Sequence, residues 1–561
     1  MSYPRFSSAD RQAGTLKKLF SGTAILSLSA VISKTTGLIY KVPLINCVGV
    51  SGMAYFLAAN HIYVLLFVIS TAGLPVAVAV LISEAISKGE SHSIGKIYKT
   101  ALRFFLALGI IGSVCMLLGA SKIARMIGIP QAAPSIAAIA PAVFMACISG
   151  AVRGYFQGHQ IMIHTAVSQV IESAGKLGLG LAGAIYARSC NMDSSIIAAY
   201  AIMGTTCGVG LSTVYLIIAK MLFDNRNYKR KSDSNKEHIN NYIGRLLKLA
   251  FPITIGAAVI SFSGVIDTAL IPNCLGACGF SDIDANMLYS CYGNMAVPMF
   301  SLTPSLIAPI ATAVVSLISA AKSSGDIARY NNAVCLSVRM TILLALPASI
   351  GLAVFAEPIL GLIFGGDISA ANVAASLLSV LALSIVPACL ITTTNAVLQA
   401  RGRAGRTIFS MLCGITIKLI TEYFLVKSRS VNIYGAPIST VLCDITVIGL
   451  NTYFVVSDLH RLKNFYRPVV GNAIAAFAAV GAAVLLWKTT DLSLMSRVAV
   501  IAPIMMAALL YAVFALLMGA VDKEMIDIIF SNKIKKREVL HEQTTKNNIS
   551  VGKAALQCRR S

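Results

Sequence analysis

Four lysines that lie within long apolar stretches carry the most distinctive chemistry of this sequence. Lys34 and Lys41 share one stretch and are seven residues apart, which places them on one face of a helix, about 10 Å from each other. A charged side chain at bilayer depth is costly and usually faces a cavity or a partner. We interpret Lys34 and Lys41 as the lining of a cavity that attracts an anion, and extension of their ammonium groups to the membrane surface is the alternative.

Lys176 and Lys418 lie in corresponding places of the two halves of the chain. Glu172 precedes Lys176 by four residues and Glu422 follows Lys418 by four, so each lysine has a possible partner on its own helix. Asp267 lies deep in a further apolar stretch. Two interpretations remain open. The lysines extend the anion site while the carboxylates bind a coupling ion, H+ or Na+, or these groups are ion pairs that stabilise helix packing.

No other set of residues predicts a chemical reaction. The sequence has no Gly-x4-Gly-Lys-Ser/Thr phosphate loop, and its thirteen cysteines and seven histidines are dispersed. Cys274 and Cys278 lie close together but without a cluster of histidines, so neither a zinc site nor a disulfide framework is predicted. We therefore expect a protein that is not an enzyme and that needs no metal or cofactor.

The elements that must position these residues are membrane-spanning helices. The chain is 57% hydrophobic and 12% charged, whereas a soluble domain is about 45–50% apolar and about 25% charged. Apolar windows long enough to span a bilayer predict an all-α polytopic protein with fourteen transmembrane helices. Their predicted ranges are 21–45, 55–83, 97–119, 131–152, 163–187, 194–220, 246–272, 287–320, 332–356, 369–398, 407–427, 433–457, 467–488 and 495–520.

The basic residues predict the orientation of these helices. The 46 Lys and Arg residues outnumber the 23 Asp and Glu residues, and most of them fall in connections on the same side as the N-terminus. In a membrane protein this excess marks cytoplasmic loops, so both termini are expected in the cytoplasm and no nucleic-acid partner is expected. The connections on the outer side carry only Lys122, Arg125, Arg188, Lys427, Arg429, Lys488 and Arg497.

The two halves of the chain repeat. Asn46-Cys47-Val48-Gly49 recurs as Asn273-Cys274-Leu275-Gly276, and Gln157, Thr165, Ser168 and Lys176 recur in order as Gln399, Thr407, Ser410 and Lys418. The matched segments have the same orientation, which indicates two parallel six-helix repeats with a site between them. The predicted organisation is a cytoplasmic segment 1–20, a first lobe 21–222, a cytoplasmic linker 223–245, a second lobe 246–457, two further helices in 458–520 and a basic cytoplasmic tail 521–561.

Several motifs of the sequence are familiar. The first predicted helix contains Ser33-Lys34-Thr35-Thr36-Gly37 through Lys41, and the fourth is followed by Arg153-Gly154-Tyr155-Phe156-Gln157-Gly158 and then Ser168-Gln169-Val170-Ile171-Glu172. The second half carries Asn395-Ala396-Val397-Leu398-Gln399-Ala400 and Asn432-Ile433-Tyr434-Gly435-Ala436-Pro437. Over most of residues 15–460 the chain resembles the stage V sporulation protein B branch of the polysaccharide transporters, within the multidrug/oligosaccharidyl-lipid/polysaccharide (MOP) exporter superfamily that includes the lipid II flippases.

The resemblance implies a V-shaped pair of lobes, alternating access and export of lipid-linked glycans from the bacterial cytoplasm. The implied cargo is undecaprenyl-pyrophosphate-linked peptidoglycan precursor (lipid II), with Lys34 and Lys41 at its pyrophosphate. Asn60, Gln157 and Gln169 are candidate sugar contacts. Lipid II flippases are expected to carry a further arginine where this sequence has Tyr292-Gly293-Asn294, and by analogy Ala475–Val484 and Ala507–Ala515 would form a groove for the lipid tail.

Two other functions remain as alternatives. A cation-coupled multidrug exporter of the same superfamily would be expected to have an acidic, aromatic cavity, whereas four buried charges here are basic and Trp487 is the single tryptophan. A non-transporting scaffold for envelope assembly would use the buried charges as structural ion pairs. The motifs suggest a sporulating Gram-positive source, a location in the cytoplasmic membrane, and membrane lipids and cell-wall synthesis proteins as partners.

Overall fold

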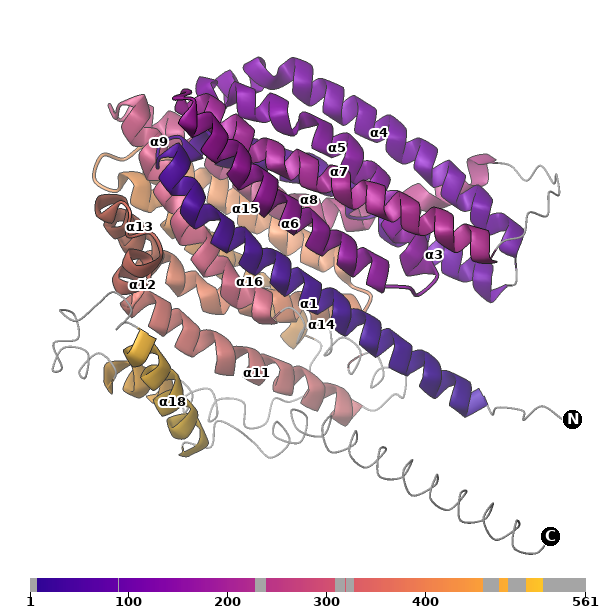
Figure 1. The fold of residues 1–561 in the computed structure, drawn as a ribbon. Helices are drawn as coiled ribbons and strands as arrows, with labels where there is room; N and C mark the ends of the chain where they lie inside the picture. The colour runs from indigo at the N-terminus through magenta and orange to yellow at the C-terminus, as the bar shows by residue number, and fades with distance from the viewer. Residues whose placement is uncertain are drawn as a thin grey trace, which may run out of the picture.

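The protein is described by a computed structural model that covers residues 8–88, 90–227, 239–307, 318, 327–457, 474–482 and 501–517. Within these ranges all regular structure is helical (Figure 1). The first half contains α1 Ser8–Val48, α2 Met53–Thr71, α3 Leu74–Ser87, α4 Ser91–Met126, α5 Ala133–Gly158, α6 Ile163–Ser189 and α7 Ser194–Asn227. The second half contains α8 Ile239–Ala277, α9 Asp282–Ser290, α11 Ile327–Val354, α12 Ala356–Ile363, α13 Ile368–Leu381, α14 Ile385–Ala400, α15 Ala404–Val426 and α16 Gly435–Val456, followed by α18 Ile501–Leu517. Short turns η1 Pro130–Ala132, η3 Ala382–Ser384 and η4 Asn432–Tyr434 are 3-10 helices, and η2 Cys291–Ala296 is a π-helix.

The described part of the chain contains nine helical segments long and apolar enough to cross a membrane. They match the predicted spans 55–83, 97–119, 131–152, 194–220, 246–272, 332–356, 369–398, 407–427 and 433–457. The spans predicted at 21–45 and 163–187 are helical too, as α1 and α6. The spans predicted at 287–320, 467–488 and 495–520 extend outside the described residues, so a total of fourteen stays a prediction.

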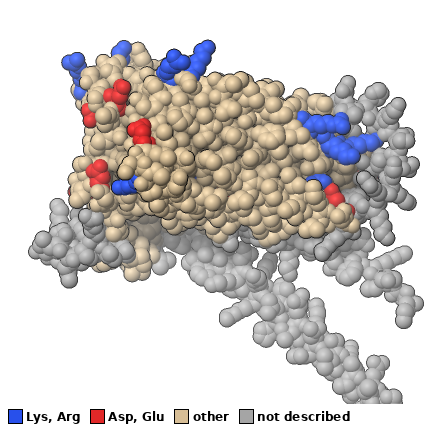
Figure 2. Space-filling view, turned by 45° about the horizontal axis from the view of Figure 1, so that its top comes forward, with Lys and Arg blue, Asp and Glu red and all other residues tan. Residues whose placement is uncertain are grey.

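Charged side chains avoid the middle of the molecule's surface. Figure 2 shows one face on which Lys, Arg, Asp and Glu gather toward the two ends of the helices, with a wide uncharged band between them. Such a band is what the hydrocarbon of a bilayer requires. The sequence-based prediction of an all-helical, multi-pass membrane protein is confirmed.

The span predicted over 55–83 is confirmed, but its helix has a local break that was not predicted. α2 ends at Thr71 and α3 begins at Leu74, with Pro75 in its first turn. A Cβ atom at Gly73 would lie 2.1 Å from the backbone oxygen of Ala250 on α8. The break therefore lets two backbones approach more closely than a residue with a side chain would permit.

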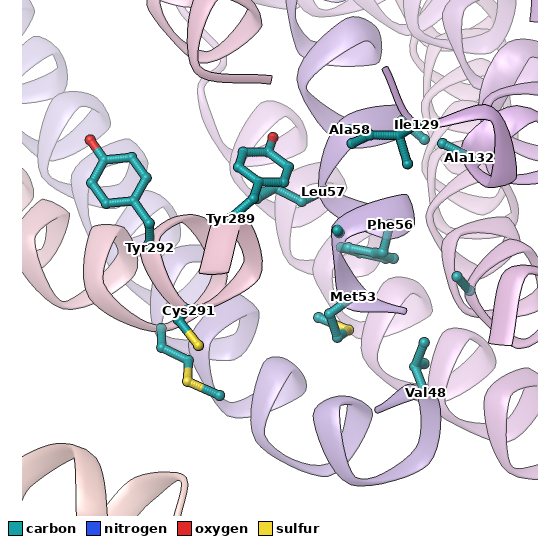
Figure 3. Packing of buried hydrophobic residues seen from close by; sticks show 14 of the residues in the cluster. Val48, Met53, Phe56, Leu57, Ala58, Ile129, Ala132, Tyr289, Cys291 and Tyr292 are labelled. Carbon is teal, nitrogen blue, oxygen red and sulfur yellow. The ribbon is translucent and has the colours of Figure 1, made fainter. Parts of the chain in front are cut away.

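The largest apolar cluster joins the two halves at the end of the molecule where α1 ends and α2 begins, here called the α1–α2 end. Met53, Phe56 and Leu57 of α2 lie there in one cluster with Tyr289 of α9 and Tyr292 of η2 (Figure 3). Toward the opposite end, separate clusters form: one in the first half together with the start of α8, and a smaller one among residues of the second half. The shared core thus holds the halves together at the α1–α2 end.

Candidate functional site

The two lysines of α1 lie on a continuous helix, as predicted. The Lys34 side chain is not buried by the protein, and its Nζ donates a hydrogen bond to the Ser305 hydroxyl in the second half of the chain. Lys41 lies two turns further along and is partly buried. Lys34 thus reaches from one half of the molecule to the other.

Lys176 of α6 joins this group through an aromatic contact. Its Nζ lies 5.6 Å from the ring centroid of Phe56 and 5.9 Å from that of Tyr40, within the range of a cation–π interaction. The Tyr40 hydroxyl donates to the Ala201 carbonyl at 2.9 Å, which fixes the ring. Tyr40 directly precedes Lys41 on α1, so Lys176 contacts the neighbour of Lys41. The fold therefore concentrates positive charge between α1, α2 and α6.

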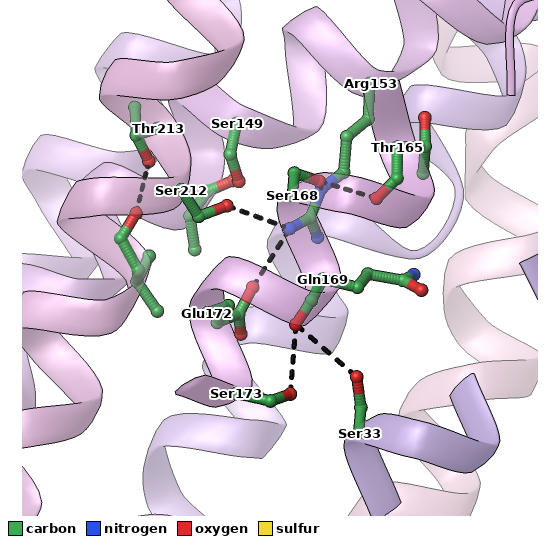
Figure 4. Close-up of polar contacts among 12 residues, drawn as sticks. Ser33, Ser149, Arg153, Thr165, Ser168, Gln169, Glu172, Ser173, Ser212 and Thr213 are labelled. Carbon is green, nitrogen blue, oxygen red and sulfur yellow. Dashed lines mark hydrogen bonds and ion pairs between the residues drawn. The ribbon is translucent and has the colours of Figure 1, made fainter. Parts of the chain in front are cut away.

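Glu172 does not form the ion pair with Lys176 that its spacing suggested. Its carboxylate pairs with Arg153 of α5 at 2.9 Å (Figure 4). Arg153 also donates to the Ser168 hydroxyl at 3.0 Å and to the Ser212 hydroxyl at 3.3 Å. The same-helix pair is corrected to a network that joins α5, α6 and α7. Its consequence is that the Glu172 carboxylate is held by Arg153 and forms no ion pair with Lys176.

The glycines of the Arg153-Gly154-Tyr155-Phe156-Gln157-Gly158 motif serve helix packing. A Cβ at Gly154 would lie 2.7 Å from the backbone oxygen of Pro75, and one at Gly158 would lie 2.7 Å from the Ile82 Cβ. α5 therefore packs directly on α3. Both positions require glycine because any side chain there would clash with α3.

Two predicted sugar contacts share one pocket with Arg153. The pocket has a volume of about 330 Å³ and lies between the α2–α3 break, α5 and α6. Its polar lining consists of Arg153, Gln157, Thr165, Gln169 and Thr71. The Ser29 hydroxyl of α1 donates to the Gln169 side-chain oxygen at 2.8 Å, which links the pocket to the helix that carries Lys34. Asn60 lies elsewhere on α2 and does not line this pocket.

Lys418 is buried in the second half, unlike Lys176. Its Nζ pairs with Asp267 of α8 at 2.6 Å and donates to the Ser263 hydroxyl at 2.9 Å. Only 3% of the Lys418 side chain is exposed. Glu422, one turn further along α15, is fully buried. The tight partner of Lys418 is thus Asp267 and not the same-helix Glu422, and the buried lysine is not available to a large anion in this state.

Contacts between the halves include residues that the sequence did not single out. His61 of α2 lies 2.8 Å from the Thr268 hydroxyl and 3.3 Å from the Tyr289 hydroxyl, both in the second half. Asn294 donates to the Met53 carbonyl at 3.0 Å. No spacing rule could have found His61, because its partners lie more than two hundred residues away in sequence.

Within the described ranges, no group of three or more His, Cys, Asp or Glu residues could hold a metal ion. The arrangement suits the binding of an anion by ammonium groups rather than covalent catalysis.

Known sequences provide independent information. The profile of a family described as "Polysaccharide biosynthesis protein" matches residues 19–322, and a profile called MatE matches residues 293–424. The uncharacterized membrane protein YabM of Bacillus subtilis is 27% identical over 533 residues, covering 92% of this chain and 96% of that protein. From the same organism, the lipid II flippase MurJ is 25% identical and stage V sporulation protein B is 24% identical, each alignment covering 75% of this chain and 80% of the relative.

Solved structures share the fold. The inward closed conformation of lipid II flippase MurJ superposes with a TM-score of 0.66 at 14% identity, covering 91% of this chain and 100% of that one. The inward-facing conformation of a multidrug resistance MATE family transporter of the MOP superfamily gives a TM-score of 0.64 at 15% identity, covering 78% of this chain and 98% of that one. At these identities the likeness concerns the fold alone.

Proposed function

The chain belongs to the polysaccharide biosynthesis protein family and is a transporter of the MOP superfamily rather than an enzyme, and from this premise we propose that it moves lipid-linked glycans across the bacterial cytoplasmic membrane. The proposed cargo is undecaprenyl-pyrophosphate-linked peptidoglycan precursor, lipid II. A pyrophosphate-sugar headgroup cannot cross about 30 Å of hydrocarbon without a polar path. Its polyprenyl tail can remain in the lipid throughout.

The cluster of Lys34, Lys41 and Lys176 is the observation that carries this proposal. Lys176 contacts the ring of Tyr40, the residue next to Lys41, and the nearby Glu172 is held by Arg153. Such a group gains stability when a polyanion binds between the ammonium groups. Lysine acts on a phosphate as a point charge, so it tolerates rotation of the headgroup while the protein changes shape.

The neighbouring pocket supports a role for Gln157 and Gln169 as sugar contacts. Amide groups both donate and accept hydrogen bonds, as the recognition of sugar hydroxyls requires. The Thr165 hydroxyl at this pocket is buried and has no hydrogen-bond partner among the described residues. Asn60 remains a candidate contact on the α2 side.

Alternating access between two lobes is the proposed mechanism. The proposed lobes are 21–222 and 246–457, joined by the linker 223–245 and followed by two helices in 458–520, for a total of fourteen spans. With both termini in the cytoplasm, the α1–α2 end faces outward. The apolar core shared by the halves lies at that end, which supports a state closed to the outside. In this proposal the lobes rock about their shared contacts to open the lysine cluster to either side.

Native mass spectrometry of the protein extracted gently from its own membrane tests this function. We expect a bound polyprenyl-pyrophosphate glycan, and we expect Lys34→Ala and Lys41→Ala each to lower the bound fraction about tenfold or more, since a hydrogen bond to a charged group contributes about 1.5–3 kcal/mol. Lys122→Ala removes an exposed lysine at the end of α4 and is the matched control.

Other outcomes would overturn the assignment. Bound glycan that is unchanged in both lysine variants would remove Lys34 and Lys41 from the site. Bulk phospholipid alone, together with tight binding of organic cations, would identify a multidrug exporter instead.

A further inference from the structure

The buried charges of the second half do not balance. Asp267, Lys418 and Glu422 lie together where α8 packs along α15, and their residues are 8%, 2% and 0% exposed. Two carboxylates and one ammonium group leave one negative charge in this buried site. An uncompensated buried charge is strongly unfavourable, so a further positive charge must be taken up.

The ion pair shows which of the two carboxyl groups lacks a cation. Lys418 is engaged with Asp267 at 2.6 Å and with Ser263 at 2.9 Å. Glu422 lies beside Asp267, and the nearby Ser439 hydroxyl donates to the Ala436 carbonyl at 2.8 Å. Neither carboxyl oxygen of Glu422 has a hydrogen-bond partner among the described residues. A carboxyl group in such surroundings is stable when it carries a proton and can itself donate a hydrogen bond.

We propose that Asp267, Lys418 and Glu422 form a proton-binding site, in which Glu422 takes up one proton and donates it in a hydrogen bond to Asp267. A proton fits this site better than a metal ion, because the Lys418 ammonium already lies against Asp267 and a metal ion at the same carboxylates would bring two cations together. The other titratable groups around Glu422 are Cys274 of α8, Tyr289 of α9, Tyr292 of η2 and Cys443 of α16.

The site is connected to the contact between the halves. Thr268 follows Asp267 directly on α8, and its hydroxyl lies 2.8 Å from His61 of α2 and 2.7 Å from the Tyr289 hydroxyl. A change of charge at Asp267 and Glu422 therefore occurs next to Thr268, which forms a hydrogen bond between the two halves. A role of the proton in driving transport rests on the proposed function, whereas proton binding itself does not.

Infrared spectroscopy of the purified full-length protein at neutral pH tests the site directly, because a protonated carboxyl group has its own carbonyl band. Relative to the wild type, Glu422→Gln should lose one such band. Asp267→Asn should lose it too, because Lys418 then pairs with Glu422 and ionises it. Lys418→Met should gain a second band, because both acids then lack a cation. Glu172→Gln, at the ion-paired glutamate of the first half, should leave the band unchanged.

Three results would overturn the proposal. The first is that the carbonyl band stays in place in Glu422→Gln, and the second is that it persists in Asp267→Asn. The third is that the melting temperature of the wild type is higher in Na+ than in K+, whereas that of Glu422→Gln is the same in both. The amide variants keep the shape of the side chains, and a variant that fails to fold is replaced by Glu422→Met in the same comparison. In proteoliposomes, glycan flux should respond to a pH gradient in the wild type and not in Glu422→Gln. If the infrared bands change as expected but no glycan flux is detected, the proposed function is contradicted and the proton site is still supported.

Discussion

The ion pairs Arg153–Glu172 and Asp267–Lys418 join different helices, although Glu172 and Lys418 each have an oppositely charged residue four positions away on their own helix. Cross-helix pairing has a functional consequence at the level of single residues. Glu172 pairs with Arg153 instead of with Lys176, and Lys418 pairs with Asp267. Two lysines in corresponding places of the repeat thus have different roles: Lys176 belongs to the proposed anion site and Lys418 to the proposed proton site.

Arg153 is predicted to stabilise the first half of the chain, in addition to any contact with the cargo. Arg153→Met leaves Glu172 without its cation, and loss of one partner from a buried pair costs about 3 kcal/mol. We expect a lower melting temperature in detergent. The double variant Arg153→Met/Glu172→Gln should recover much of this loss, because no unpaired charge then remains. Equal stability of Arg153→Met and the wild type would contradict the network.

At the level of helices, α6 and α7 approach through glycines. A Cβ at Gly175 would lie 2.6 Å from the Gly208 Cα, and one at Gly208 would lie 2.5 Å from the Glu172 carbonyl oxygen. Close backbone approach is a common way of packing membrane helices. It also positions the turn that carries Glu172 and Lys176.

Gly175→Ala is therefore expected to destabilise the protein by about 1–3 kcal/mol through overpacking. Gly178 lies on the same helix, three residues further along, and a Cβ there would meet nothing within 4 Å. Gly178→Ala should leave stability unchanged or raise it slightly, because alanine has a higher helix propensity than glycine. Thermal unfolding of both variants checks the contrast, and equal effects would contradict it.

α13 begins with a capping aspartate, Asp367, which lies just before the apolar residues of the span. Asp367 accepts hydrogen bonds from the Ser369 hydroxyl at 2.7 Å and the Ala370 N–H at 3.1 Å, and these bonds hold the pKa of its carboxyl below the usual value. A lowered folded-state pKa stabilises the fold above the unfolded-state pKa, and the contribution is lost as the pH falls through the folded value.

Asp367→Ala should reduce the free energy of unfolding by about 1 kcal/mol at neutral pH. The difference from the wild type should shrink at acidic pH, where the carboxyl is protonated in both states. Asp367→Asn keeps a capping side chain and should show a smaller loss. A difference between Asp367→Ala and the wild type that does not change with pH would contradict the charge-dependent cap.

For the whole molecule, orientation in the membrane decides which end of the lysine cluster meets the cytoplasm. Cys190 is exposed in the connection between α6 and α7, and Lys88 is exposed at the opposite end, after α3. With the N-terminus inside, we expect a membrane-impermeant maleimide to label intact cells at Cys190, and this signal to disappear in Cys190→Ser.

A Lys88→Cys variant in the Cys190→Ser background is the matched control and should be labelled only after the cells are permeabilised. The reverse pattern would invert the proposed topology. It would also place the shared apolar core at the cytoplasmic side, and the state described here would then be closed to the cytoplasm.

The sequence by itself determined the class of protein, most of the helices and the residues worth attention. Hydrophobic runs and the exclusion of charge from lipid are local constraints, so apolar windows located nine of the observed spans, and the lysines inside them were found by the cost of burying charge. Helix breaks such as Gly73 were missed, because their cause is the backbone of α8 rather than a local signal.

Only the tertiary structure decided which charges meet. Glu172 and Lys176 are neighbours in sequence, yet Arg153 on another helix binds the carboxylate, and Asp267 reaches Lys418 from 151 residues away along the chain. Rules for residues four apart describe an isolated helix, whereas in a bundle a side chain on the next helix can be as close and better oriented. The division of Lys176 and Lys418 between two different environments therefore arises from helix packing, which a repeat in the sequence cannot reveal.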